Sequence, residues 1–230
     1  MKLLTLGNTK TAKGTSKGIL TFILHLAPAK LSGFNVCPMA SKGCAAACLN
    51  TAGRGRFDRT QAARVRKTRE FFENRDSFMA QLVKDIKAAV RKADREGYDP
   101  AIRLNGTSDI RWENMPIGGF PNLMAMFPTV QFYDYTKIAN RKGIPANYHL
   151  TFSRSESNDG DVAKVLGTPV NIAVVFNVKK GAPLPAVWNG RKVIDGDLTD
   201  VRFFDPASVI VGLRSKGDGK HDATGFVVTV

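Results

Sequence analysis

Three cysteines lie close together near the start of the chain. Cys37, Cys44 and Cys48 are the only cysteines among 230 residues, and all three fall within twelve positions. Three thiols leave one over if two form a disulfide. Cys44 and Cys48 are four positions apart in an Ala-rich segment, where a helix would place both on one face with their Cα atoms near the limit for an unstrained bridge. Because thiolates are soft metal ligands, the spacing predicts a metal centre.

The number of ligands narrows the choice of metal. A [4Fe–4S] cluster is held by thiolates, and three cysteines leave one iron open to a substrate, a cofactor or a distant Asp or His. A structural zinc ion needs four ligands, usually from CxxC pairs, and this chain has no CxxC. His25, His149 or His221 would have to complete a zinc site. The cluster is therefore favoured, while zinc and inert buried thiols remain alternatives.

The residues just after the cysteines suit an anionic group. Gly53 and Gly55 allow backbone amides to approach a ligand closely, and such amides bind anions. Arg54 and Arg56 are predicted to offset the charge of the cluster or to hold a carboxylate or phosphate. Solvated loop charge is the alternative for both arginines.

Elements on either side of the cysteine segment are predicted from periodicity. Residues Ile19–Ala27 form a nearly continuous apolar run, typical of a buried strand, in which His25 either reaches the site or is a satisfied core residue. Residues 59–95 have helical periodicity with a break around Asn74, and Gly97 ends the second helix.

Short apolar strands then alternate with helical segments. The predicted strands are Ala101–Leu104, Val130–Tyr133, Tyr148–Phe152, Val170–Phe176 and Val209–Leu213, with a final strand in GFVVTV. The predicted helical segments are Asn122–Met126, Lys137–Arg141 and Gly160–Leu166. This alternation indicates an α/β protein with a parallel sheet. With the opening strand there are about six units, which predicts a TIM-like partial (βα)-barrel with the cysteine loop after its first strand.

Polar residues follow the predicted strands, where a site in such a fold is built. The candidates for catalysis are Asp109, Asp134, Lys137, Arg154 and Glu156. Asn105 and Ser108 are candidates for cofactor binding. Since these residue types also form turns and caps, a structural role is the alternative for each of them.

The chain is expected to be a single α/β domain over residues 1–230, which is long enough to bury a full core. Residues 1–18 are predicted to be a flexible basic arm. Residues 179–208 are predicted to be a hairpin-bearing insertion with a tight turn at Asn189-Gly190. Three nearby aspartates resemble a calcium loop but lack its bidentate Glu, and are interpreted as turn residues: Asp195, Asp197 and Asp200.

The net charge of +14 favours a polyanionic partner. Basic segments at Lys10–Lys17 and Arg214–Lys220 support an alternative function, a nucleic-acid-binding accessory protein whose metal, zinc or cluster, only holds the cysteine loop together. Neither a helix-turn-helix nor an aromatic stacking motif is present in the sequence. No apolar run is long enough to span a membrane, and the first apolar stretch is too short for a secretory signal, which predicts a cytoplasmic protein without a membrane partner.

A family resemblance is carried by the cysteine segment and the end of the chain. The motifs TAKG, LHLAPA, CPMAS-x-GC-x-x-ACLNTAGRG and, late in the chain, IVGLRSKG and GFVV stand in this order. With them the chain resembles, over nearly its whole length, an uncharacterised bacteriophage protein family named after gene eighty-eight of a mycobacteriophage. The resemblance implies a phage-encoded protein in the host cytoplasm, whose partner is an unknown small molecule or host factor.

The cysteine loop is more distantly similar to that of radical S-adenosylmethionine enzymes, which place a three-cysteine [4Fe–4S] loop after the first strand of a partial barrel. That likeness implies a redox or radical reaction on an unknown substrate. Their loops have three and then two intervening residues, whereas this chain has six and then three. Asn105–Asp109 stands where those enzymes have a Gly-Gly-Glu-like segment, so binding of S-adenosylmethionine, and enzymatic activity itself, stay open.

Overall fold

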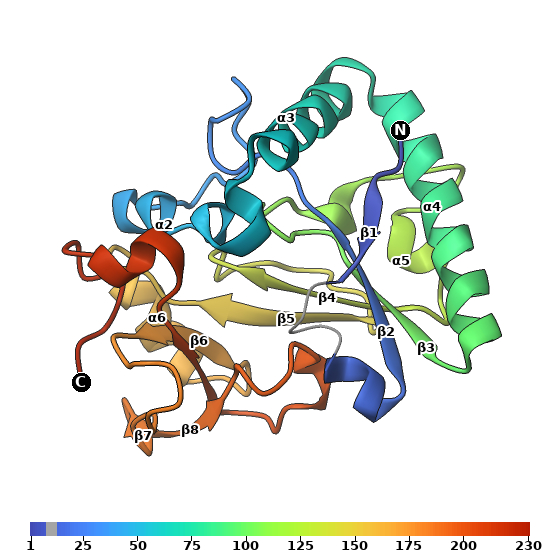
Figure 1. Cartoon of the computed structure of the whole chain (residues 1–230). Helices are drawn as coiled ribbons and strands as arrows, with labels where there is room; N and C mark the ends of the chain where they lie inside the picture. Colours follow the sequence, from blue (N-terminus) through green and yellow to red (C-terminus); the bar gives the residue numbers. More distant parts are fainter. Residues whose placement is uncertain (8–12) are drawn as a thin grey trace.

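A mixed α/β fold is built around one sheet (Figure 1). The structure, a computed structural model, describes residues 1–7 and 13–230. Over these residues the sheet has nine strands in the order β1-β2-β3-β4-β5-β6-β9-β8-β7. The strands are β1 (Leu4–Leu6), β2 (Ile19–Leu24), β3 (Asp99–Arg103), β4 (Gln131–Thr136), β5 (Tyr148–Ser153), β6 (Ile172–Phe176), β7 (Val187–Trp188), β8 (Arg191–Asp195) and β9 (Ile210–Arg214).

Most neighbouring strands are parallel, as predicted. The pairs from β2 to β6, and on to β9 and β8, are parallel, and only the outermost pairs, β1–β2 and β7–β8, are antiparallel. The loops after β2 to β6 therefore leave from one edge of the sheet, here called the carboxyl edge. Among the described residues no pairing closes the sheet into a barrel, and β1 and β7 are its two ends. Because β1 comes first, the cysteine segment follows the second strand of the chain.

Two long helices cover one face of the sheet (Figure 1). The helices are α2 (Lys42–Ala46), α3 (Asp58–Glu73), α4 (Arg75–Glu96), α5 (Leu123–Met126) and α6 (Asp159–Leu166). Short 3-10 helices are η1 (Lys13–Lys17), η2 (Leu49–Thr51), η3 (Gly53–Arg56), η4 (Trp112–Asn114), η5 (Arg202–Phe204) and η6 (Gly217–His221). The predicted break at Asn74 separates α3 from α4, and Gly97 ends α4 with a positive φ of 73°. The main core joins α3 and α4 to the sheet through Phe71, Phe78, Leu82, Ile86, Phe22, Ile102 and Phe132.

Of the predicted flexible arm at residues 1–18, the described residues 1–7 and 13–18 contain β1 and η1 instead, and residues 8–12 lie outside the description. Leu3 and Leu4 are buried, and their amides donate to Asp85 Oδ2 at 2.6 and 3.0 Å. Lys67 Nζ donates to the Leu3 carbonyl at 2.6 Å. These contacts hold β1 against the helices, while Lys10 lies outside the described residues.

Two other predicted elements are absent from the described chain. Residues Lys137–Arg141 form turns rather than a helix, since the Lys137 amide donates to the Asp109 carboxylate. The final GFVVTV segment makes a single bridge between Val228 and Phe176 rather than a strand.

The insertion at 179–208 contains the predicted hairpin. β7 and β8 join at Asn189 and Gly190, whose φ angles of 44° and 77° suit a tight turn. β8 also pairs in parallel with β9, so the hairpin extends the main sheet.

Candidate metal centre

The three cysteines lie at the carboxyl edge, on the segment that contains α2 and η2. Cys37 precedes α2, Cys44 lies within it, and Cys48 is the N-cap of η2. All three are reduced and half-buried. The prediction that Cys44 and Cys48 share one helix face is wrong, because α2 ends at Ala46 and Cys48 lies outside it as the N-cap of η2, with a ψ of 138°.

Two of the sulfurs each accept a hydrogen bond from one backbone amide. The Ala29 amide donates to Cys37 Sγ at 3.4 Å, and the Asn50 amide donates to the Cys48 sulfur. Cys37 Sγ in turn lies 3.7 Å from the Thr107 carbonyl. Amide donors to sulfur stabilise thiolates and tune bound iron–sulfur groups.

Burial and neighbouring thiols raise the pKa of two of the cysteines. Burial, together with the charges of Cys48, Cys44 and Asp109, raises the pKa of Cys37 to about 12, against the Ala29 hydrogen bond. Burial and the charge of Cys44 also raise the pKa of Cys48. Each of these two pKa values is raised in part by a neighbouring cysteine, and a bound cation would favour the thiolate forms.

Two cations face the cysteines, and neither was among the arginines predicted for this role. The charges of Arg64 and Lys137 both lower the pKa of Cys48. Arg64 is buried on α3 and donates to Asn50 Oδ1, whereas its Nε has no hydrogen-bond partner in the described structure. Arg54 and Arg56 are exposed on η3.

Arg64 could have been found from helical spacing. Its buried neighbours on α3 are Thr68 and Phe71, four and seven positions further along. Residues at this spacing lie on the same face of a helix. Arg64 therefore points to the protein interior together with Phe71.

Glu156 positions the cysteine helix. Its carboxylate accepts from Ser41 Oγ and from the Gly43 amide, both at 2.7 Å, and Ser41 Oγ also accepts from the Cys44 amide at 3.1 Å. Burial raises the pKa of Glu156, but the hydrogen bonds from Ser41 and Gly43 outweigh it and leave the pKa below its usual value. The residue predicted as catalytic thus caps the first turn of α2.

Asp109 and Lys137 lie on two loops at the carboxyl edge that backbone amides join to the cysteine segment and to each other through hydrogen bonds. The Asp109 amide donates to the Val36 carbonyl at 2.8 Å, beside Cys37, and Asp109 Oδ2 accepts from the Lys137 amide at 2.8 Å. Lys137 Nζ donates to Ser153 Oγ at 2.9 Å. Burial raises the pKa of Asp109. Its Oδ1 has no hydrogen bond in the described structure, and Arg141 Nη1 lies 3.7 Å away.

Asn105 and Ser108 serve the loop rather than an open cavity. Asn105 Oδ1 accepts from Ser108 Oγ at 2.8 Å, from the Ile110 amide at 2.9 Å and from Trp112 Nε1 at 3.1 Å. The Asn105 amide donates to Asp134 Oδ1 at 2.8 Å. These bonds fix the loop that carries Asp109.

Asp134 and Arg154 make structural contacts within the protein. Asp134 is inside β4, fully buried, and accepts from Tyr148 OH at 2.9 Å; burial raises its pKa to about 7. Arg154 donates to the carbonyls of Gly225 and Phe226, so it ties the C-terminal segment to β5.

The remaining metal-ligand types do not complete an ion site. Among residues 1–7 and 13–230 no group of three or more His, Cys, Asp or Glu side chains could hold a metal ion. His25 lies near Arg64, Arg103 and Lys67, and burial and these three charges lower its pKa to about 3. His25 is therefore neutral at physiological pH.

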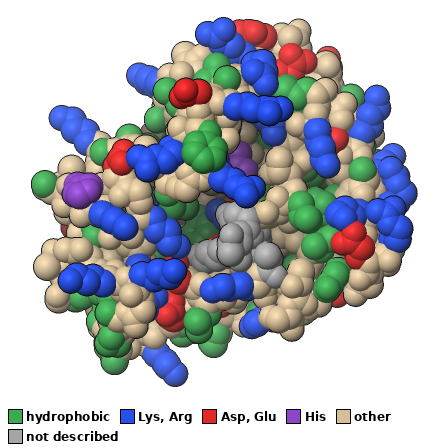
Figure 2. All heavy atoms as spheres, viewed as in Figure 1, with side chains coloured by type: hydrophobic (Ala, Val, Ile, Leu, Met, Phe, Trp, Pro, Cys, Tyr) green, Lys and Arg blue, Asp and Glu red, His purple; other side chains and the backbone are tan. Residues whose placement is uncertain are grey.

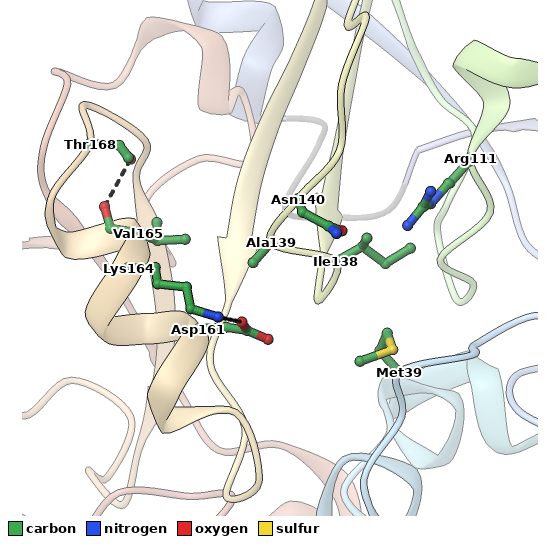
Figure 3. A pocket seen from close by; sticks show the side chains of 9 residues that line it. All are labelled: Met39, Arg111, Ile138, Ala139, Asn140, Asp161, Lys164, Val165 and Thr168. Carbon is green, nitrogen blue, oxygen red and sulfur yellow. Dashed lines mark hydrogen bonds and ion pairs between the residues drawn. The ribbon is translucent and has the colours of Figure 1, made fainter.

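A pocket of about 420 Å³ opens beside the cysteine segment (Figure 3). Its lining consists of Met39, Arg111, Ile138, Ala139, Asn140, Asp161, Lys164, Val165 and Thr168. Arg111 and Met39 extend toward Ile138 from one side, whereas Lys164 turns to Asp161 on the other (Figure 3).

Fold and site together define an α/β protein with a partly buried three-cysteine segment at the carboxyl edge of a mostly parallel sheet. A family model described as Gene product 88 matches residues 2–230. The chain therefore belongs to this family, as its motifs predicted. No curated protein and no solved structure gives a significant match, so the likeness to radical S-adenosylmethionine enzymes is not supported. No helix in the described residues is both long and apolar enough to cross a membrane.

Proposed function

We propose that this phage protein binds a [4Fe–4S] cluster through Cys37, Cys44 and Cys48, and uses it in a redox or radical reaction on a small molecule. One observation carries the proposal: three partly buried thiols lie on one short segment, where the Ala29 amide donates to Cys37 Sγ and buried Arg64, bonded to Asn50 beside Cys48, leaves its Nε without a hydrogen-bond partner in the described structure. A cluster with its thiolates is anionic, and buried cations offset that charge.

The donor chemistry of the segment supports the proposal. Iron–sulfur clusters are bound by cysteine sulfurs that accept hydrogen bonds from backbone amides, and this segment supplies both. The side chains do not converge on one ion, but each cysteine of a cubane binds a different iron, so its sulfurs need not meet at a point. Three cysteines leave one iron for another ligand.

Residues next to the thiols have separate roles in this proposal. When bound, the cluster supplies one-electron transfer. Arg64 and Lys137 offset its charge. Asp109 can hold a proton nearer to neutral pH than an exposed carboxyl, because burial raises its pKa. The sheet, in this proposal, curves as a partial barrel with these groups at its rim.

The test is the metal content of anaerobically purified protein made with iron–sulfur assembly support. We expect about four irons and four sulfides per chain. Each of Cys37→Ala, Cys44→Ala and Cys48→Ala should lose most of both, whereas Ala45→Ser, at an exposed position of α2, should keep them. One zinc without sulfide, or no metal at all, would overturn the proposal.

Binding of a polyanion is a second candidate. Lys and Arg side chains are spread widely over the face seen in Figure 2, and exposed ones on α3 and α4 include Arg66, Arg69, Lys84 and Arg91. Affinity for DNA or RNA should then fall steeply with salt. Weak binding that does not change with salt would exclude this candidate.

A further inference from the structure

The pocket and the cysteine site are built from the same three loops. Each loop gives one residue to the thiol site and another, one or two positions further on, to the pocket. Cys37 is followed by Met39, Asp109 by Arg111, and Lys137 by Ile138. Bonds from the Asp109 amide to Val36 and from the Lys137 amide to Asp109 hold the loops together.

The charges around the pocket are not balanced. Lys164 pairs with Asp161 at 3.2 Å, and Thr168 Oγ1 donates to the Val165 carbonyl at 2.8 Å. The Arg111 side chain is exposed and has no hydrogen bond or ion pair within the described chain. It extends into the pocket near Asn140 (Figure 3). An unpaired guanidinium recognises carboxylates and phosphates through paired N–H donors.

Part of the pocket lining is apolar. Ile138, Ala139 and Val165 contribute hydrocarbon surface, and Met39 lies opposite Ile138 (Figure 3). The volume of about 420 Å³ lies in the range that accommodates small organic molecules. Apolar surface with one unpaired cation selects a ligand that has both an apolar body and a negative group.

We propose that this pocket binds a small organic anion, with its carboxylate or phosphate on Arg111 and its apolar body against Ile138, Ala139 and Val165. The pocket needs no metal, so the inference stands independently of the cluster. If the cluster is also bound, the same anion is placed beside Cys37 as the molecule that reacts.

Binding is tested by titrating the full-length protein with three probes of similar shape: phenylacetate, benzyl phosphate and neutral benzyl alcohol. Calorimetry or NMR line broadening would give the Kd with metal-free and with iron-loaded protein. We expect one or both anions to bind and the alcohol to bind at least about tenfold more weakly, since a charged hydrogen-bond pair contributes roughly that much. The better anion identifies the group that the pocket prefers.

Variants assign the site of binding. Arg111→Ala should raise the Kd of the anion about tenfold or more, and Arg111→Lys should raise it less. Ala139→Trp should block the pocket and abolish binding. Arg95→Ala is the matched control, because Arg95 is also exposed and unpaired but lies on α4. Failure of both anions to bind, or binding unchanged in Arg111→Ala and Ala139→Trp, would overturn the inference. Anion binding by a chain that takes up no iron would support the pocket while overturning the cluster.

Discussion

Two segments of this protein concentrate metal-ligand side chains, and the fold treats them differently. The cysteine segment has three thiols within twelve residues, and the insertion has Asp195, Asp197 and Asp200 within six. Arg214 Nη1 contacts Asp195 at 2.9 Å and Asp197 at 3.4 Å. Arg103 Nη1 contacts Asp200 at 2.7 Å. The aspartates are therefore engaged by cations of the chain itself.

Within the described residues, no cationic side chain bonds to a cysteine sulfur. Two sulfurs accept backbone amides, and the nearby cations Arg64 and Lys137 bond to Asn50 and Ser153 rather than to a thiol. Ligand-type residues that are clustered in sequence become a candidate site only where the fold does not pair them with cations of the same chain. That distinction depends on partners that are remote along the chain.

The largest effect is expected at Gly43, which lets α2 approach the C-terminal segment. A Cβ at Gly43 would lie 2.0 Å from Thr224 Oγ1 and 2.8 Å from Phe226 Cβ. Gly43→Ala should lower the free energy of unfolding by about 1–3 kcal/mol, as overpacking does. It should also reduce iron binding, because α2 carries Cys44. Urea unfolding and iron content measure the two effects.

Gly160 provides the matched control. It is the second residue of α6, as Gly43 is of α2, but a Cβ there meets nothing within 4 Å. Gly160→Ala should be neutral or stabilise the protein by up to about 1 kcal/mol. Equal effects of the two substitutions would mean that close packing of α2 does not hold the cysteine segment.

Removing Arg214 should lower the stability of the protein without changing its iron content. Its guanidinium contacts Asp195 and Asp197 and donates to the Ala182 carbonyl at 2.7 Å. Arg214→Ala leaves those carboxylates less neutralised, so the free energy of unfolding should fall by about 2 kcal/mol while iron content stays unchanged. Lys192→Ala, an exposed and unpaired position on β8, should change neither.

The cysteine variants should show the reverse pattern, with iron lost and the metal-free protein nearly as stable as before. A loss of iron in Arg214→Ala as large as in Cys44→Ala would contradict the separation of the two segments.

Much of the fold could be predicted from the sequence because its signals are local. Apolar runs located the parallel strands, and Gly97 located the end of α4 to the residue. β1 was missed because a strand of three residues has no periodicity to detect, and its stability comes from Asp85 and Lys67 on distant helices. Whether the sheet closes into a barrel could not be predicted from local sequence patterns, because it depends on which strands pair at the two ends of the sheet.

The candidate site was predictable in its thiols but not in its surroundings. Spacing alone predicts Cys37, Cys44 and Cys48 as a unit, and the structure places all three on one segment at the carboxyl edge. Asp134 follows a strand in the predicted pattern, but β4 runs two residues past it and buries it. The cap that Glu156 makes on Gly43 joins residues 113 positions apart, which no sequence pattern encodes.

The smallest effect is expected at Glu156, where pH can test how the cysteine helix is held. Hydrogen bonds from Ser41 and Gly43 put its pKa below the usual value, so the folded state favours the carboxylate. The resulting stabilisation is present above the ordinary pKa of about 4.5 and is lost as pH falls through the lower pKa of the folded state. Glu156→Gln should lower the free energy of unfolding by about 1 kcal/mol at neutral pH, because a neutral amide replaces the carboxylate that accepts the two charge-assisted hydrogen bonds. Urea unfolding at several pH values from neutral to acid measures this effect. The difference in the free energy of unfolding between wild type and Glu156→Gln should shrink to zero on acidification. The control is Asp159→Asn, at an exposed acid at the start of α6, whose free energy of unfolding should differ little from wild type at every pH. A gap that stays constant as pH falls would mean that shape, rather than the carboxylate charge, holds α2 in place.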